Sequence, residues 1–248
     1  MTYCVALQLN SGLVFMSDTR TNGGVDNINK FRKMYTWSVP GDRVITILSA
    51  GNLATTQAVI SHLEDRMKLP EYREPILSKA LTMFEVAQMV GEILADVIRS
   101  SSGDSGQQAA SAFNATLIVG GQISTSESRI FMIYPEGNFI EASEDTPYFQ
   151  LGETKYGRPI LVRAFDQNMS FEDAVKMLLL SFDSTIKANL SVSAPLDLMY
   201  YENNSLQVTY QHRFEEDDPY LLQVSHGWGD ALKMAFDTLP NFAPYGTN

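Results

Sequence analysis

The sequence of 248 residues has one cysteine, three histidines and no apolar stretch of 18 residues. A lone Cys4 excludes an intramolecular disulfide and a cysteine-based metal cluster, and its apolar neighbours predict a small core residue. A catalytic thiol would need a nearby histidine, and all three lie far off in sequence. The apolar stretches are too short to span a membrane, and the N-terminus lacks the basic residues of a secretory signal. We therefore expect a cytoplasmic protein, with no metal and no other cofactor.

Positive charge is scarce as well. The 18 Lys and Arg stand against 29 Asp and Glu, which gives a formal net charge of −11 at pH 7. Such a surface repels phosphate backbones and anionic lipid, so we expect no nucleic-acid partner and no membrane partner. The Gly-x-x-x-x-Gly-Lys loop of many ATPases does not occur either. Any ATP-driven unfolding would therefore come from a separate ATPase, which the sequence does not identify.

What the chain does have is the composition of an ordinary globular protein, with 44% hydrophobic residues. No break in composition marks a linker, so we expect residues 1–248 to form a single domain. Segments of period two between turn signals predict strands. These strands cover residues 3–9, 13–17, 33–39, 43–49, 115–120, 129–134, 138–142, 196–201 and 206–212, with a loop at 19–29.

Apolar residues at helical spacing predict four helices. They run from Leu53 to before Pro70, over 76–98 with Leu77, Leu81 and Phe84 on the core face, from a Ser170 cap to Phe182, and over 219–236. Strands linked by turns, rather than alternating with helices, are typical of antiparallel sheets with separate helix layers. The sequence therefore predicts an α+β fold, a four-layer αββα sandwich of two sheets with helices outside.

The N-terminus carries a candidate nucleophile. Initiator methionine is normally removed before a small residue, which would leave Thr2 with a hydroxyl and a free α-amine on adjacent carbons. An α-amine titrates near ~7.7–8.0 against ~10.4 for a lysine, so it can be neutral and accept the hydroxyl proton. Thr2 alone is a weak signal, because many proteins begin Met-Thr without any catalytic use of the threonine.

Two charged residues strengthen the signal. A hairpin of the first two strands returns Asp18 to the side of Thr2, and Lys33 begins the next strand. An ammonium there would lower the pKa of the hydroxyl, while Asp18 would hold the lysine charged and oriented. The plain alternatives are a solvated turn at Asp18 and a surface cation at Lys33, and spacing alone leaves them open.

These residues carry a resemblance to a known family. Residues 12–21, Gly-Leu-Val-Phe-Met-Ser-Asp-Thr-Arg-Thr, resemble the Gly-Val-Val-x-Ala-x-Asp-x-Arg-x-Thr block of proteasome β-type subunits, and Thr2 stands 16 residues before Asp18, as in that family. Residues 49–54 resemble the Ala-Gly segment that opens the first helix of the family. The similarity is closer to the Anbu branch, the bacterial ancestral β subunits. The matching segments are residues 26–28, 31–34, 48–57, 152–161 and 195–198.

The resemblance implies an N-terminal-nucleophile (Ntn) hydrolase fold, a threonine peptidase and self-assembly into a ring or open spiral. It implies Thr2 as nucleophile with its own amine as base, and Asp18 and Lys33 as electrostatic partners. The backbone N–H of Gly51 is implied as the oxyanion donor, a contribution of roughly 2.7–4 kcal/mol to the barrier. The substrate side chain, small or apolar, would lie in a pocket lined by Thr21, Ser49 and Leu53.

The sequence departs from the family pattern in three places. Lys33 comes one residue earlier than in most proteasome β subunits, which leaves Lys30 as an alternative. The supporting Gly-Ser-Gly reads Gly-Glu-Thr at 152–154, so Glu153 and Thr154 stand there. The downstream Asp-x-x-Ser support appears as Asn189 and Ser191, or with Ser193 in register.

Three functions remain open at this point. The first is a self-assembling threonine hydrolase that cleaves peptides or unfolded proteins and that is activated by loss of Met1. The second is an oligomeric scaffold of the same fold with little or no proteolysis. The third is a small-molecule amidase, because threonine–amine chemistry serves any amide. Fold analogy cannot choose among them.

Overall fold

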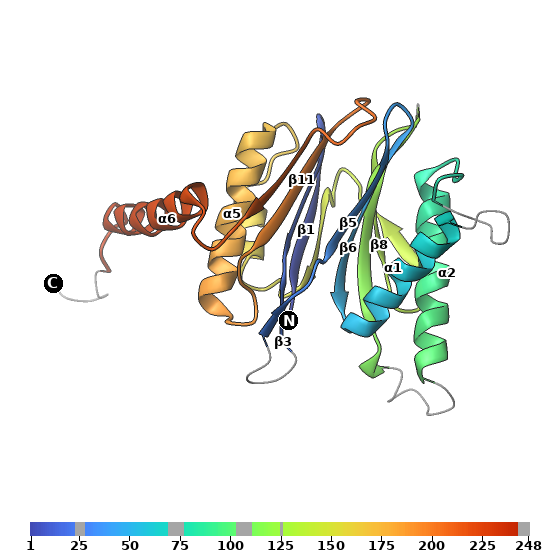
Figure 1. Cartoon of the computed structure of the whole chain (residues 1–248). Helices are drawn as coiled ribbons and strands as arrows, with labels where there is room; N and C mark the ends of the chain where they lie inside the picture. The colour runs from blue at the N-terminus through green and yellow to red at the C-terminus, as the bar shows by residue number, and fades with distance from the viewer. Residues whose placement is uncertain (23–27, 69–76, 103–110, 125, 243–248) are drawn as a thin grey trace.

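The computed structural model describes residues 1–22, 28–68, 77–102, 111–124 and 126–242. Two antiparallel sheets pack face to face, and helices cover both outer faces (Figure 1). The predicted α+β sandwich of four layers is therefore confirmed. Among the described helices, none combines the length and the apolar composition needed to cross a membrane.

The first sheet holds the N-terminal hairpin at its centre, in the order β10-β1-β2-β11-β12. Tyr3, Val5 and Leu7 of β1 pack toward the helices, whereas Cys4 and Ala6 pack toward the second sheet. The first strand is therefore buried on both faces, and Cys4 is the core residue that its apolar neighbours predict. The strands are β1 (Tyr3–Leu9), β2 (Gly12–Asp18), β10 (Tyr148–Gly152), β11 (Leu196–Glu202) and β12 (Tyr210–Phe214).

The second sheet runs in the order β5-β6-β7-β8-β9. Ile45 and Ile47 of β6 face the helices, while Val44 and Leu48 face the first sheet. This alternation gives three apolar layers, one between the sheets and one under each helix layer. The strands are β5 (Met34–Val39), β6 (Arg43–Gly51), β7 (Ala115–Ile123), β8 (Arg129–Ile133) and β9 (Phe139–Glu141).

The helices lie on opposite sides of the sandwich, α1 and α2 over the second sheet and α5 over the first, with α6 outside α5 (Figure 1). Ser170 caps α5 as predicted, its Oγ accepting the N–H of Asp173 at 3.1 Å. The helices are α1 (Leu53–Lys68), α2 (Met83–Ser102), α4 (Arg158–Ala164), α5 (Phe171–Ala188) and α6 (Pro219–Asp237).

The predicted start of the second helix is wrong. The structure begins α2 at Met83, because Thr82 caps it by accepting the N–H of Glu85 while the Glu85 carboxylate accepts the N–H of Leu81. Residue 76 lies outside the described ranges. Leu81 and Phe84, expected on the core face, are 76% and 47% exposed, and Leu77 is buried in a turn instead.

Other local features were missed or misplaced by the sequence pattern. Residues 19–29, expected to be a loop, contribute the short strands β3 (Arg20–Asn22) and β4 (Ile28–Lys30), with 23–27 outside the described ranges. Strand β10 and helix α4 were not predicted. The last strand lies at Tyr210–Phe214 rather than 206–212, and Leu206, with φ 46°, does not have an extended backbone.

Arg43 fixes the turn before α2 to the second sheet. Its buried guanidinium donates to the carbonyl oxygens of Leu77 at 2.7 Å and Ala80 at 2.9 Å. We expect Arg43→Met to lower the free energy of unfolding by about 2–4 kcal/mol, because two carbonyls lose a charged donor in the interior. Urea unfolding measures this change. The matched control is Arg129→Met, whose pair with Glu141 is partly exposed and should be worth under about 1 kcal/mol; equal losses in the two variants would contradict the role of Arg43.

Candidate active site at the N-terminus

The hairpin of β1 and β2 brings Asp18 to the start of the chain. Cys4 pairs with Ser17 in the antiparallel register, so the last residue of β2 lies beside Thr2 and Tyr3. The backbone N–H of Tyr3 donates to Oδ1 of Asp18 at 2.9 Å. The carboxylate is fully buried, and its position next to Thr2 is the one that the hairpin predicts.

Lys33 joins Tyr3 and Asp18 in one hydrogen-bonded group, the Asp18 cluster. Its Nζ donates to Oδ1 of Asp18 at 2.8 Å, to the carbonyl oxygen of Arg20, and to that of Met1 at 3.3 Å. An ammonium has three N–H groups, so each has an acceptor. Lys30, the alternative, is exposed and lies 3.9 Å from a Glu216 carboxylate oxygen. The structure therefore brings Lys33 and not Lys30 to the start of the chain.

Burial sets the electrostatics of this cluster. It raises the pKa of Asp18 to about 6, and the neighbouring Lys33 opposes that rise. Oδ2 of Asp18 is buried and has no hydrogen-bond partner among the described residues, so it is the oxygen that would take a proton. Burial, followed by the charge of Lys33, lowers the pKa of the Met1 α-amine below its ordinary value. The Met1 α-amine is thus held in the neutral form more readily than in water.

A pocket of about 380 Å³ opens beside this cluster. Thr21, Ser49 and Leu53 line it, as the resemblance implies, and so does Lys33. Thr56 and Gly152 also line it and were not predicted. The signal for Thr56 was its place three residues after Leu53, which puts both on one face of α1. The full lining is Met1, Thr2, Thr21, Lys33, Ser49, Ala50, Gly51, Leu53, Thr56 and Gly152.

Two glycines form the backbone of the pocket rim. Gly51 ends β6 with φ 114°, and a Cβ there would collide with the carbonyl oxygen of Asn114. Asn52 follows and caps α1, its side-chain oxygen accepting the N–H of Thr55 at 3.1 Å. The positive end of the α1 dipole therefore lies next to Gly51, where a developing oxyanion would be stabilised. A Cβ at Gly152, where φ is 80°, would collide with the carbonyl oxygen of Thr2.

Glu153, Asn189 and Ser191, which the sequence offers as supporting residues, are linked to Thr2 by hydrogen bonds. The N–H of Glu153 donates to the carbonyl oxygen of Thr2 at 2.7 Å. The side-chain amide of Asn189 donates to Oε2 of Glu153 at 3.0 Å, and the N–H of Ser191 donates to Oδ1 of Asn189 at 3.0 Å. The structure thus joins Glu153, Asn189 and Ser191, while Thr154 lines a neighbouring cavity with Gly51 and Gly152.

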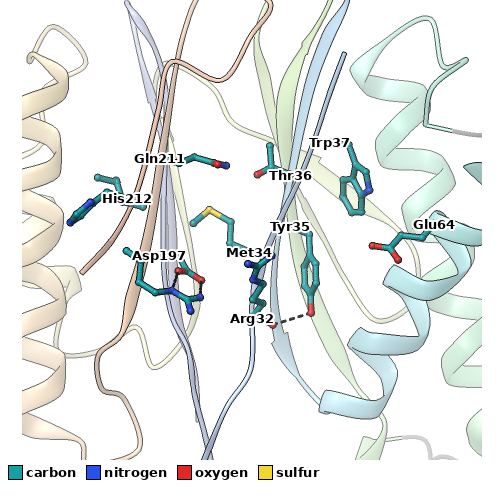
Figure 2. A pocket seen from close by; sticks show the side chains of 11 residues that line it. Arg32, Met34, Tyr35, Thr36, Trp37, Glu64, Asp197, Gln211 and His212 are labelled. Carbon is teal, nitrogen blue, oxygen red and sulfur yellow. Dashed lines mark hydrogen bonds and ion pairs between the residues drawn. The ribbon is translucent and has the colours of Figure 1, made fainter. Parts of the chain in front are cut away.

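A larger cavity of about 550 Å³ lies at the open edge of the sandwich, between β5 and β12 (Figure 2). Arg213 there binds both carboxylate oxygens of Asp197, at 2.6 and 2.9 Å, and the hydroxyl of Tyr35 donates to the carbonyl oxygen of Arg32. Its lining includes neither Thr2 nor any residue of the Asp18 cluster.

Within the described ranges, no group of three or more His, Cys, Asp or Glu side chains could hold a metal ion. The pocket at Thr2 is therefore the candidate active site.

Comparisons with known proteins agree with this architecture. The family model "Proteasome subunit" matches residues 2–195. Anbu (ancestral beta-subunit) from Yersinia bercovieri is 45% identical, with a TM-score of 0.91 over 98% of this chain and 99% of that one. Anbu from Hyphomicrobium sp. strain MC1 is 44% identical, with a TM-score of 0.88 over 98% of this chain and 100% of that one.

A third solved structure, described as the helical assembly of the Anbu complex from Pseudomonas aeruginosa, is 40% identical with a TM-score of 0.91 over 99% of this chain and 100% of that one. The sequence search of curated proteins gives no match. The family model matches most of the chain, and the identities are 40–45% over nearly the full length. This similarity goes beyond a shared fold. The chain belongs to the proteasome subunit family, in its Anbu (ancestral beta-subunit) branch.

Proposed function

We propose that the protein is an N-terminal-threonine hydrolase that cleaves amide bonds in peptides or unfolded proteins once Met1 has been removed. One observation carries the proposal. Lys33 is 4% exposed, and its ammonium is fixed by Asp18 and donates to the Met1 carbonyl beside Thr2, in a pocket large enough for a side chain. Burying a lysine and a carboxylate beside a pocket costs desolvation free energy. Such buried charged pairs at pockets are typical of functional sites.

The chemistry uses the chain's own groups. The α-amine of Thr2 takes the proton from the hydroxyl, and Oγ attacks the substrate carbonyl carbon. The positive charge of Lys33 stabilises the anionic oxygen of Thr2 as it forms, and the N–H of Gly51 stabilises the oxyanion. The amine then gives the proton to the leaving nitrogen, an acyl ester on Thr2 remains, and water hydrolyses it by the same steps.

The remaining site residues have supporting parts in this proposal. Glu153 and Asn189, hydrogen-bonded to each other, take the place of the usual supporting serine and aspartate and hold the strand that carries Thr2. Thr21, Ser49 and Leu53 face the substrate side chain. Their short polar and apolar groups, together with Thr56, favour a small or apolar residue at the cleaved bond.

We also propose that copies of the chain assemble side by side, as a ring or open spiral. The relative from Pseudomonas aeruginosa is described as a helical assembly, and the similarity covers 99% of this chain. A scaffold of the same fold with little hydrolysis is the second candidate. The observation in its favour is the carboxylate of Glu153 at a position where the family has a hydroxyl.

Mass spectrometry of the N-terminus after treatment with an epoxyketone tests the proposed chemistry. An epoxyketone reacts with both the hydroxyl and the free amine of an N-terminal threonine. We expect loss of Met1 and one adduct on Thr2. An N-terminus that begins at Thr2 but takes up no reagent would favour the scaffold, and adduct on another residue would overturn the assignment of Thr2.

The raised pKa of Asp18 predicts how the rate of the reaction depends on pH. Its pKa is raised to about 6, so the carboxylate takes up a proton as pH falls through that value and no longer holds Lys33. We expect kcat/KM to fall more steeply below pH 6 than above it, because protonation of Asp18 then adds to protonation of the Thr2 amine that serves as base. The free energy of unfolding should change in the opposite sense, rising as pH falls from 6 toward 4, because the folded state binds this proton more tightly than the unfolded chain.

A pH–rate profile and urea unfolding at two pH values measure both effects. The control is Asp18→Asn, whose remaining activity should lose the step near pH 6. An unchanged step in that variant would show that another group titrates there.

A further inference from the structure

A second cavity of about 380 Å³ adjoins the candidate active site, and we call it the β10 cavity because the end of β10 forms one of its walls. It shares Ala50, Gly51 and Gly152 with the pocket at Thr2, but neither Thr2 nor Lys33 lines it. The largest side chain on this shared rim is a methyl group. An extended backbone can therefore pass over the rim from one cavity into the other.

The shared rim also fixes where the β10 cavity lies relative to the cleaved bond. In the proposed mechanism the oxyanion binds at Gly51, which belongs to the rim itself. The side chain before the cleaved bond lies in the pocket with Thr21 and Leu53, neither of which lines the β10 cavity. The segment after the cleaved bond has to leave the pocket in another direction, and the rim opens into the β10 cavity.

Strand β10 offers free backbone groups along this cavity. It is the edge strand of the first sheet, and among the described strands β1 alone pairs with it. The N–H of Glu153 donates to the carbonyl oxygen of Thr2 in this antiparallel register, so the N–H and C=O groups of Gln150 and Gly152 point away from β1. Both residues line the cavity and together span about 7 Å of strand, which is enough to pair with two residues of an extended peptide.

The side chains around the β10 cavity are uncharged. Thr116 and Met132 come from the second sheet, and Asn114 and Thr154 come from the segments before β7 and after β10. The side chains of Asn114, Thr116 and Thr154 have no hydrogen-bond partner among the described residues, so they can bond to a ligand. No charged residue within the described ranges lines this cavity. A charged side chain placed there would lose hydration without gaining an opposite charge.

We propose that the β10 cavity binds the two residues that follow the cleaved bond of a peptide substrate, in extended form along the edge of β10. The inference rests on the proposed hydrolysis at Thr2, and it makes a peptide rather than a small-molecule amide the substrate. Backbone hydrogen bonds to Gln150 and Gly152 fix the direction of this segment, and the uncharged lining favours uncharged side chains. A segment held in this way keeps the leaving nitrogen beside the α-amine of Thr2, which has to protonate it.

The first test compares two peptides on the wild-type protein. They are identical up to the cleaved bond, with a small apolar residue before it. One continues with a single alanine amide and the other with two alanines before the amide, so both release the nitrogen of an alanine. We expect kcat/KM to be at least about tenfold higher for the longer peptide. Lysine in place of its second alanine should remove most of this advantage, because the charge would be buried without a partner.

The second test fills the cavity. Thr116→Leu narrows the β10 cavity, whose lining does not include Thr2. It should lower kcat/KM of the longer peptide to that of the shorter one. Labelling of Thr2 by an epoxyketone should continue at the wild-type rate, because this reagent has no segment beyond its reacting group. Thr36→Leu is the matched control, because Thr36 is another partly buried threonine of the second sheet and lines the larger cavity between β5 and β12 (Figure 2). It should keep the full advantage of the longer peptide.

Each outcome decides the inference. Equal kcat/KM for the two alanine peptides in wild type would overturn it, while labelling of Thr2 would leave the proposed nucleophile intact. Equal losses for both peptides in a Thr116→Leu protein that still labels would also overturn it, as would labelling without cleavage of either peptide. Absence of labelling in wild type would overturn the proposed function, and the inference with it. If Thr116→Leu alone fails to label, the three peptides on the wild-type protein decide.

Discussion

Thr2→Ala should abolish hydrolysis and covalent labelling, with a loss of about 10⁴-fold or more in kcat. The mechanism has no substitute for a hydroxyl on the N-terminal residue, since the amine that serves as base belongs to the same residue. Alanine is also small, so removal of Met1 should proceed as before. The bond between the carbonyl oxygen of Thr2 and the N–H of Glu153 uses only backbone, so the fold should be unchanged.

Steady-state cleavage of a peptide with a small apolar residue at the cleaved bond measures this loss, and thermal unfolding checks the fold. Thr2→Ser is the control, because it keeps the hydroxyl and should retain measurable activity and labelling. Undiminished labelling in Thr2→Ala would contradict the assignment of Thr2 as the nucleophile.

Neighbouring strands made the centre of the site predictable. Two strands of seven residues joined by a tight turn must bring Asp18 back to the start of β1, whatever the rest of the chain does. Lys33 could be predicted for the same reason, since it stands directly before β5, the strand that follows the short β3–β4 ribbon. Sequence spacing left Lys30 open, and only the packed structure separates a lysine that is 4% exposed from one on the surface.

Parts of the site that depend on contacts between distant segments were less predictable. Gly152 and Glu153 meet Thr2 because β10 pairs with β1, and β10 was not predicted from its sequence pattern. The pairing of Glu153 with Asn189 joins the end of β10 to the end of α5. No local period in the sequence reports such a contact.

The errors in the helices have a similar physical cause. Residues 76–98 have an apolar pattern that continues without a break, but the Thr82 and Glu85 side chains bond to the backbone and start the helix at Met83. Propensity and periodicity favour a helix throughout this segment, and the cap decides where it begins. Leu81 is exposed because it precedes the helix, and Phe84 because it lies within α2 on a different face from the buried Met83 and Ala87.

Lys33→Ala should lower kcat/KM by more than about 100-fold, because it removes the cation at the point where the hydroxyl and the substrate carbonyl develop negative charge. Lys30→Ala is the matched control, with the same change of charge three residues away on an exposed side chain, and should have little effect. The reverse result would mean that Lys30 replaces Lys33 in the active enzyme.

A loss of activity in Lys33→Ala could also arise from damage to the fold, because Asp18 is left buried without its partner. The double variant Asp18→Asn with Lys33→Met separates the two causes. It removes both buried charges, so the free energy of unfolding should recover relative to Lys33→Ala. Activity should stay low, since the ammonium of Lys33 beside Thr2 is gone. Recovery of both stability and activity in the double variant would show that Lys33 serves only to neutralise Asp18, and that the attack by Thr2 needs no positive charge beside it.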